Sequence, residues 1–162
     1  MRALLLASVL FVGLFDCPST SPVPVPTHAF CRTLWMFGLP CADVGAKLVQ
    51  QIRTFSPVNM CEKCHYILIS ATNKSIQARH TSPDNLHVES LEFSLQTNLL
   101  TTSCRVSAQS VSLTFTAYFN NGLNYCNLYN LLTASGLNLA PDFMEMTSEW
   151  ACFGFGSTTC RT

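Results

Sequence analysis

The stretch HYILISATNKSIQARHTSPDNLHVESLEFSLQT, residues 65–97, gives the clearest indication of the fold of this 162-residue chain. Its first run, 65–71, is short, apolar and rich in branched side chains, which is typical of a buried strand. A turn at Asn73 leads into a second run over 76–81. Pro83 then stands at the second position of the next turn, where its fixed backbone dihedral fits a type I turn. These features predict antiparallel strands joined by short turns.

A third strand is predicted over residues 86–97, where apolar and polar residues alternate. Leu86 and Val88 fall on the opposite phase from the apolar residues that follow them, so a β-bulge is expected near Glu89 and Ser90. The apolar residues that follow, all on one face, are Leu91, Phe93 and Leu95.

The most regular alternation of the chain lies at residues 111–119, and it predicts a fourth strand with an apolar inner face. The inward-facing set is Val111, Leu113, Phe115, Ala117 and Phe119. The sequence Asn120-Asn121-Gly122 is a turn signal that ends this strand.

Two helices are predicted on either side of these strands. The first covers residues 41–55, where apolar residues recur at helical spacing and Pro57 stops the pattern. The apolar positions are Cys41, Val44, Leu48, Ile52 and Phe55. The second is a short helix around Tyr125 and Leu128 that ends at Gly136.

Together these elements predict an α+β fold. The expected architecture is a small disulfide-rich domain with an antiparallel sheet of about four strands and one or two helices packed on one face. A helix followed by a meander of four strands resembles the layout of the cystatins. The inhibitory Q-x-V-x-G loop of that family is matched only at Gln109 and Val111 within QSVSL, so the resemblance does not extend to inhibition. A second layout to consider is the ML-type lipid-carrier sandwich, which lacks the early helix.

The N-terminus has the composition of a secretory signal peptide. Arg2 precedes an apolar or small-residue run of 13 positions, residues 3–15, and a transmembrane helix needs about 20. Residues 1–19 are therefore predicted to be a cleaved signal peptide. Residues 20–30 form a Pro/Ser/Thr-rich leader, and residues 31–162 form a single disulfide-stabilised α+β domain.

The cysteine count supports this cleavage. The chain has nine cysteines, and removal of Cys17 with the signal peptide leaves an even number, which predicts four disulfides in an oxidising compartment. The remaining cysteines are Cys31, Cys41, Cys61, Cys64, Cys104, Cys126, Cys152 and Cys160. Eight cysteines allow on the order of 100 pairings. Proximity in sequence suggests Cys31–Cys41, Cys61–Cys64 and Cys152–Cys160, which leaves Cys104–Cys126.

Charge and hydropathy exclude several classes of partner. Only 11% of the residues are charged and the formal net charge is zero, so nothing indicates binding to nucleic acid or to an anionic membrane surface. No apolar segment of the chain reaches transmembrane length, and no membrane span is expected in the mature form. The composition indicates a secreted, extracellular protein, with its oligomeric state left open.

The pattern Cys61-Glu62-Lys63-Cys64-His65 matches the attachment sequence of haem c and also a redox C-x-x-C. Redox dithiols lie at a helix N-terminus, but Cys64 leads into a predicted strand. No second C-x-x-C follows that would complete a zinc site. We therefore expect a structural disulfide, with no cofactor and no metal.

A hydrolytic site requires a nucleophile, a base and an orienting acid. His80 with Asp84 and Glu89 forms the one candidate group, since these residues flank the turn at 82–85. No G-x-S-x-G nucleophile motif occurs in the chain. No catalytic residue is assigned, and a non-enzymatic protein is expected.

Three surface features remain. Asn73-Lys74-Ser75 is an N-glycosylation sequence, which predicts a glycoprotein. Trp35, Met36 and Phe37 lie between two cysteines and form either a displayed interaction loop or part of the core. The asparagines between positions 121 and 138 indicate either a recognition surface or turns and helix ends.

These features predict a secreted non-enzymatic binding protein that recognises another extracellular or cell-surface protein. The alternative is a carrier of a small hydrophobic, lipid-like ligand in a core cavity lined by Phe93, Leu113 and Phe115. A secreted hydrolase is a third class and would need His80 or His65 in a cleft beside a nucleophile.

Overall fold

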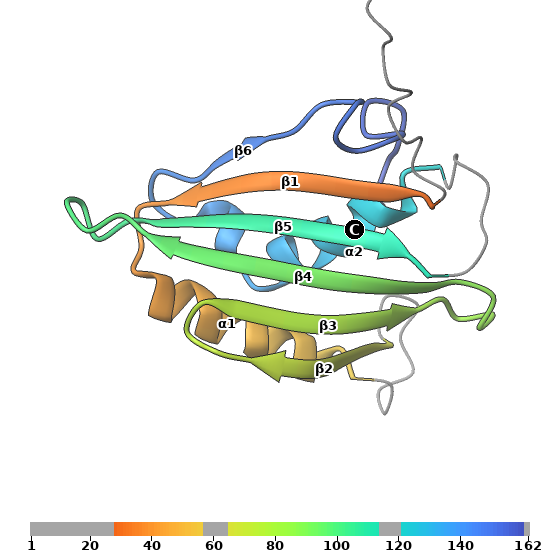
Figure 1. Cartoon of the computed structure of the whole chain (residues 1–162), viewed down its shortest axis with the longest axis horizontal. Coiled ribbons are helices and arrows are strands. Elements are labelled where there is room, and N and C mark those ends of the chain that lie inside the picture. The colour runs from red at the N-terminus through yellow and green to blue at the C-terminus, as the bar shows by residue number, and fades with distance from the viewer. Residues whose placement is uncertain (1–27, 57–64, 114–120, 161–162) are drawn as a thin grey trace, which may run out of the picture.

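An antiparallel sheet backed by two α-helices forms the part of the chain described by this computed structural model, residues 28–56, 65–113 and 121–160. The elements in chain order are β1 (Phe30–Phe37), α1 (Cys41–Thr54), β2 (Tyr66–Ala71), β3 (Ser75–Thr81), β4 (Val88–Thr97), β5 (Cys104–Ser112), α2 (Leu123–Ala134), the 3₁₀ turn η1 (Leu137–Leu139) and β6 (Met144–Met146). Within these residues the sheet has six strands in the order β2-β3-β4-β5-β1-β6 (Figure 1). The first strand of the chain, β1, therefore lies between the last two strands, β5 and β6.

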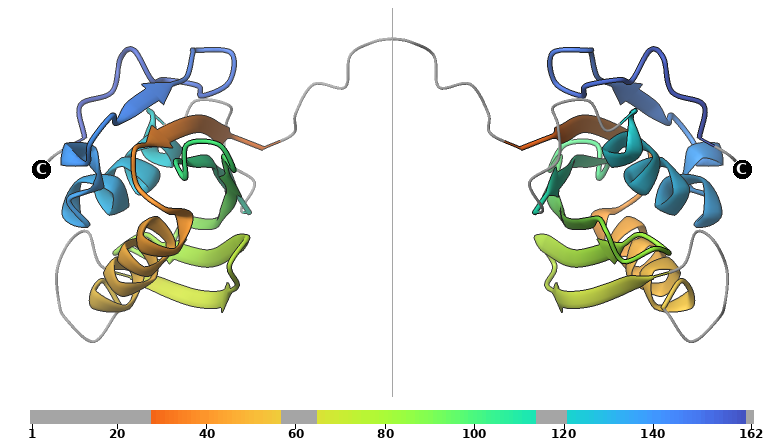
Figure 2. Two further views of the ribbon diagram at one scale, coloured as in Figure 1. Left: turned by 90° about the vertical axis from the view of Figure 1, so that its left-hand side faces the viewer. Right: turned by 90° about the vertical axis from the view of Figure 1, so that its right-hand side faces the viewer.

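Both helices lie on the same face of the sheet, as the two side views show (Figure 2). The buried stripe of α1, which includes Val44, Leu48 and Ile52, packs toward the strands. Gly45 lies on this contact, because a Cβ at that position would stand 3.3 Å from a methyl group of Leu95. The absence of a side chain at Gly45 therefore lets the helix approach β4 closely.

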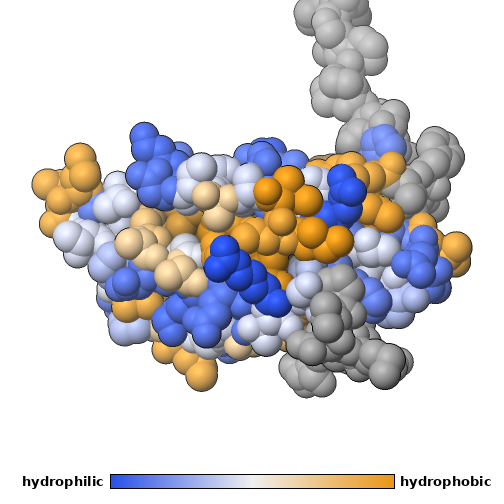
Figure 3. Space-filling model, turned by 90° about the horizontal axis from the view of Figure 1, so that it is seen from below, coloured by the Kyte–Doolittle hydropathy of each residue, from blue (hydrophilic) through white to orange (hydrophobic). Residues whose placement is uncertain are grey.

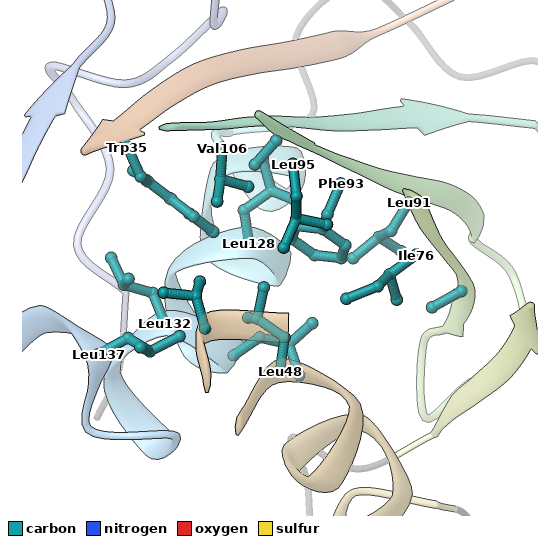
Figure 4. Packing of buried hydrophobic residues seen from close by; sticks show 14 of the residues in the cluster. Trp35, Leu48, Ile76, Leu91, Phe93, Leu95, Val106, Leu128, Leu132 and Leu137 are labelled. Carbon is teal, nitrogen blue, oxygen red and sulfur yellow. The ribbon is translucent and has the colours of Figure 1, made fainter. Parts of the chain in front are cut away.

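The core fills the space between the sheet and the two helices (Figure 4). Trp35 of β1, Leu48 of α1, Phe93 of β4 and Leu128 of α2 are all fully buried. The rings of Trp35 and Phe93 lie 6.0 Å apart between their centroids. Four elements that are distant in sequence thus contribute to one apolar cluster, which is the dominant stabilising contribution to a fold of this kind.

The predicted fold class is confirmed, with more strands than the expected number of about four. The helix over 41–54 and the strands over 66–71, 75–81 and 88–97 lie where the sequence patterns placed them. β1 and β6 were not predicted. β1 has regular alternation of buried and exposed residues, but its closeness to two cysteines suggested a loop instead.

The strand predicted over 111–119 is wrong over residues 111–113, the part of it that the structure describes. β5 spans Cys104–Ser112, Val111 points away from the helices, and Leu113 is half exposed beyond the end of the strand. Residues 114–120 lie outside the described residues. The inner-face residues of β5 include the small or polar Ala108, Ser110 and Ser112, so a search for large apolar side chains does not detect this face.

The bulge predicted near Glu89 and Ser90 is also wrong. Both residues pair in regular register with β3 and β5. The register shift lies instead between Leu68 and Ser70 of β2. The change of phase at Leu86 arises because this residue is exposed in the turn before β4, which begins at Val88.

The suggested disulfide pairing is wrong for all the cysteines that the structure describes. The bridges are Cys31–Cys152, Cys41–Cys104 and Cys126–Cys160. Proximity in sequence failed because an extended strand advances about 3.3 Å per residue, so β1 carries Cys31 far from Cys41. Phe37, at the other end of β1, pairs with Cys104, which places Cys104 beside the start of α1. Cys61 and Cys64 lie outside the described residues.

In the described part of the chain, neither α-helix has the length and the apolar character that crossing a membrane requires.

Candidate functional site

The face of the sheet opposite the helices is the outer face, and it is turned toward the viewer in Figure 1. No described element covers this face in that view, so the side chains that alternate with the core residues point outward from it. What this face presents is therefore set by the register of the strands.

The register aligns these outward residues in rows across the strands. Each row runs through β4, β5, β1 and β6 in turn. One row contains Gln96, Arg105, Met36 and Met144. The next row contains Ser94, Ser107, Leu34 and Met146.

The β1 and β6 ends of these two rows bring four apolar side chains together, Leu34, Met36, Met144 and Met146, which we call the methionine face. Met36, Met144 and Met146 are 40%, 53% and 45% exposed. Such a block is notable because the outward residues of β3, β4 and β5 are mostly serine, glutamine and charged side chains. A contiguous exposed apolar patch rimmed by polar residues is typical of an interaction surface.

Two shallow grooves flank the methionine face. One, of about 570 Å³, is lined by residues that include Met36, Gln96, Arg105 and Asp142. The other, of about 440 Å³, is lined in part by Met146, and it shares Gln96 and Arg105 with the first. Arg105 thus stands between the two grooves, beside the methionines.

The guanidinium of Arg105 forms no ion pair or hydrogen bond within residues 28–56, 65–113 and 121–160. The equivalent group of Arg32, farther along β1, donates to the Oε1 of Gln109 at 2.8 Å. Arg105 is therefore an unoccupied cation next to an apolar surface, whereas Arg32 is already held by a neighbour. Arginine beside apolar anchors is a common composition for an interface.

A carboxylate on the inner side of β6 fixes this edge strand in place. Glu145 Oε1 accepts hydrogen bonds from Trp35 Nε1 at 2.9 Å and from Thr33 Oγ1 at 3.0 Å. Its Oε2 accepts a third from the hydroxyl of Tyr125 in α2, at 3.0 Å. Burial, together with the charge of Glu145, raises the pKa of Tyr125. Because Glu145 points inward, Met144 and Met146 on either side of it must point outward.

A close approach at the end of β1 also positions this edge. The amide of Gly38 donates to the carbonyl of Pro141 at 2.8 Å. A Cβ at position 38 would lie 2.7 Å from Asp142 Oδ2, so a larger residue there requires Asp142 to shift. Gly38 thus allows the segment before β6 to lie against β1.

Only one of the three residues proposed as an interaction loop is part of this surface. Trp35 and Phe37 are buried in β1, at 0% and 1% exposure, so they are not a displayed loop. The strand alternation turns their rings toward the helices and Met36 toward solvent. Met144 and Met146 were missed, although the alternating sequence Met-Glu-Met indicates a strand with one buried and two exposed positions.

The structure brings together part of the proposed catalytic group. His80 Nδ1 lies 2.8 Å from Glu89 Oε2 across the β3–β4 pair, and both residues are buried. Asp84 does not join them, because it accepts a hydrogen bond from Ser82 Oγ, which lowers the pKa of Asp84. The ring of Tyr66 covers His80, with 4.7 Å between the ring centroids. At 5% exposure His80 is not open to a substrate, so this pair is part of the core.

The metal and haem hypotheses gain no support from the described residues, among which no cluster of three potential ligands occurs. His65 directly precedes β2 and has a φ of 87°, and its carbonyl accepts a hydrogen bond from the amide of Thr81. The two cysteines of the C-x-x-C-H pattern, Cys61 and Cys64, lie outside the described residues.

Two of the five asparagines in the asparagine-rich segment are internal. Asn124 and Asn127 of α2 are buried at 1% and 2% exposure. Ser110 Oγ donates to Asn124 Oδ1 at 2.7 Å, and Asn124 Nδ2 donates to Ser112 Oγ at 3.2 Å. The side-chain amide of Asn124 thus connects α2 to β5, which is a packing role.

The cavity expected for a hydrophobic carrier does not form around the predicted residues. Phe93 is fully buried against Trp35, and Leu113 is 50% exposed at the end of β5. Phe115 lies outside the described residues. Phe93 and Leu113 therefore do not line a common interior space.

Comparison with known proteins gives little guidance. No protein-family model and no curated protein matches the sequence. Among solved structures, the chain is similar to an HSP90 activator from Plasmodium falciparum, with 8% sequence identity and a TM-score of 0.43. This similarity covers 73% of this chain and 99% of that chain. At this level it carries no argument about fold or function.

Proposed function

We propose that this chain is a secreted, non-enzymatic binding protein that recognises another extracellular protein through the methionine face. The disulfides Cys31–Cys152, Cys41–Cys104 and Cys126–Cys160 are compatible with an oxidising, extracellular location. In this proposal, residues 1–19 act as a cleaved signal peptide that directs the protein to the extracellular space.

The exposed apolar block beside β4 and β5, whose outward residues are mostly polar, is the observation that carries this proposal. Met36, Met144 and Met146 come from two strands that are about a hundred residues apart in the chain, and they share one exposed surface. Exposed thioether side chains adapt their shape to a partner, which suits a binding surface. Trp150, four residues after Met146 in the chain, is 86% exposed and is an aromatic side chain of the kind that is enriched in interfaces.

The charge at this surface favours a particular kind of partner. Arg105 stands between the two grooves without an ion pair in the described part of the chain. A partner that places a carboxylate over Arg105 and apolar side chains over the methionines would satisfy both features. A buried charge-assisted contact of this kind contributes mainly to specificity.

The test is a binding experiment with the full chain secreted from eukaryotic cells. Labelled protein is titrated on cell surfaces before and after treatment of those cells with protease. We expect saturable binding that protease removes and that Met36→Lys weakens at least tenfold, or about 1.4 kcal/mol. The matched control is Ser90→Lys, which adds the same charge to an exposed position in β4 on the same sheet face.

Equal loss of binding in Met36→Lys and Ser90→Lys would contradict the assignment to the methionine face. Binding that survives protease treatment would contradict a protein partner. A native mass spectrum that shows a retained small molecule would favour the carrier alternative instead.

A further inference from the structure

The edge of the sheet formed by β2 exposes an unusual amount of apolar surface. β2 is the last strand in the order, with β3 as its one neighbour among the described strands. Ile67 and Ile69 are 46% and 56% exposed. β2 is the lowest strand in Figure 1, and the view of the molecule from below shows apolar surface gathered on this side (Figure 3).

Edge strands of this composition tend to pair with other chains. Natural proteins protect such edges with charged residues, prolines, bulges or very short strands. The sequence YILISA of Tyr66–Ala71 contains no charge and no proline. The register shift between Leu68 and Ser70 is the one such feature within β2. By comparison, the opposite edge strand, β6, is three residues long.

The turn that follows β2 presents an acceptor for a protecting group. Asn73 is exposed, and its amide side chain makes no hydrogen bond to a described residue. The turn around it is well fixed, since Thr72 Oγ1 accepts from the amides of Lys74 at 3.2 Å and Ser75 at 2.9 Å. Asn73 lies two residues beyond Ala71, the last residue of β2.

The same turn carries the N-glycosylation sequence Asn73-Lys74-Ser75, the one N-x-S/T sequence in the chain. The hydroxyl of Ser75 takes part in none of the hydrogen bonds that close the turn, which use its backbone amide and carbonyl. The sequence requirement for a glycan is thus met at an accessible position beside the exposed edge.

We propose that an N-linked glycan on Asn73 covers the apolar edge of β2 and prevents the protein from associating with itself through that edge. In the reaction, Asn73 Nδ2 forms a bond to the anomeric carbon of an oligosaccharide supplied as its lipid-linked diphosphate. The lipid diphosphate leaves, and the amide nitrogen gives up one proton. The inference rests on the proposed secretory location, because this modification occurs during secretion.

The experiment compares two substitutions of one residue that differ in whether the glycan is retained. Ser75→Thr keeps the glycosylation sequence and Ser75→Ala removes it, and neither removes a backbone hydrogen bond of the turn. Each full-length protein is secreted from eukaryotic cells, and its molar mass is measured by light scattering between about 1 and 100 µM. This concentration range detects self-association with dissociation constants in the micromolar range.

We expect the natural sequence and Ser75→Thr to remain monomeric with one glycan, and Ser75→Ala to associate as its concentration rises. Adding Ile67→Lys to Ser75→Ala places a charge on the edge and should restore the monomer. If Ser75→Ala is not secreted, enzymatic removal of the glycan from the folded natural protein provides the same comparison.

Three results would overturn the inference. They are a secreted natural protein with an unmodified Asn73, a glycan-free protein that stays monomeric, and an association that Ile67→Lys does not relieve. None of these results bears on the methionine face, whereas failure of the chain to enter the secretory pathway would contradict the proposed function itself.

Discussion

The two edges of the sheet are attached to the rest of the molecule in related ways but expose different surfaces. At one edge, the hydroxyl of Tyr66 in β2 donates to the carbonyl of Asn127 in α2 at 2.9 Å. At the other, the hydroxyl of Tyr125 in α2 donates to Glu145 Oε2 in β6 at 3.0 Å. The helix α2 therefore contacts both edge strands through a tyrosine hydroxyl.

The two edge strands, β2 and β6, differ in the other interactions that attach them to the rest of the molecule. β6 makes three paired positions with β1 and gains further hydrogen bonds from Trp35 and Thr33 to Glu145. The segment after it is fixed by the Cys31–Cys152 disulfide. β2 is held by its longer pairing with β3 and by α1. The short edge strand β6 thus depends on side-chain hydrogen bonds and a nearby disulfide. The longer edge strand β2 depends mainly on its backbone hydrogen bonds with β3.

The largest effect is expected from removing the disulfide beside the β6 edge. Replacing Cys31 and Cys152 together with alanine opens a loop with a sequence separation of 121. The loss of this constraint on the unfolded chain should lower the free energy of unfolding by about 5 kcal/mol. Urea unfolding, followed by tryptophan fluorescence, measures the change.

Removal of the Cys126–Cys160 disulfide is the matched comparison, because its sequence separation is 34. The loop-entropy argument predicts a loss about 1 kcal/mol smaller. A larger loss at Cys126–Cys160 would show that loop length does not govern the contribution of these disulfides.

An intermediate effect is expected at Glu145. Glu145→Ala leaves the donors of Trp35, Thr33 and Tyr125 without their acceptor, which should cost about 3 kcal/mol of stability. Glu145→Gln keeps one acceptor oxygen and should cost about half as much. The control Glu92→Gln changes an exposed carboxylate on the outer face and should alter the free energy of unfolding by less than about 0.5 kcal/mol. Equal effects of Glu145→Ala and Glu92→Gln would contradict the role given to Glu145.

The smallest effect is expected from alkaline pH, and it acts on both edges. Burial raises the pKa of Tyr66, and burial with the Glu145 charge raises that of Tyr125. As pH rises above about 10, the unfolded tyrosines ionise while the folded ones stay neutral, so stability falls with increasing pH. Below about pH 10 the tyrosines are neutral in both states, so the stabilising contribution of the two buried hydroxyls is fully present.

Phenolate absorbance of the folded protein, with unfolding curves at pH 8 and above pH 10, measures this effect. Tyr66→Phe and Tyr125→Phe should each reduce the alkaline loss of stability. Normal ionisation of all four tyrosines near pH 10 in the folded protein would contradict the burial of these two hydroxyls.

The sequence predicted the candidate site only in part. Two flanking cysteines suggest a loop that contains Trp35, Met36 and Phe37, whereas the strand alternation of β1 turns Met36 to the opposite side from the other two. Glu89 was correctly considered as a neighbour of His80, since the two residues flank a short turn. Arg105, Met144 and Met146 carried no local signal of function, because single exposed residues of these types are common.

Local periodicity in the sequence determined the α+β class, the first helix, three of the strands and the turn that carries Asn73. Each of these depends on neighbours within a few residues, which the sequence displays directly. The tertiary structure alone decided the insertion of β1 between β5 and β6, the disulfide pairing and the composition of the methionine face. Alternation indicates which side of a strand a residue occupies, but pairing between segments a hundred residues apart depends on packing of the whole core.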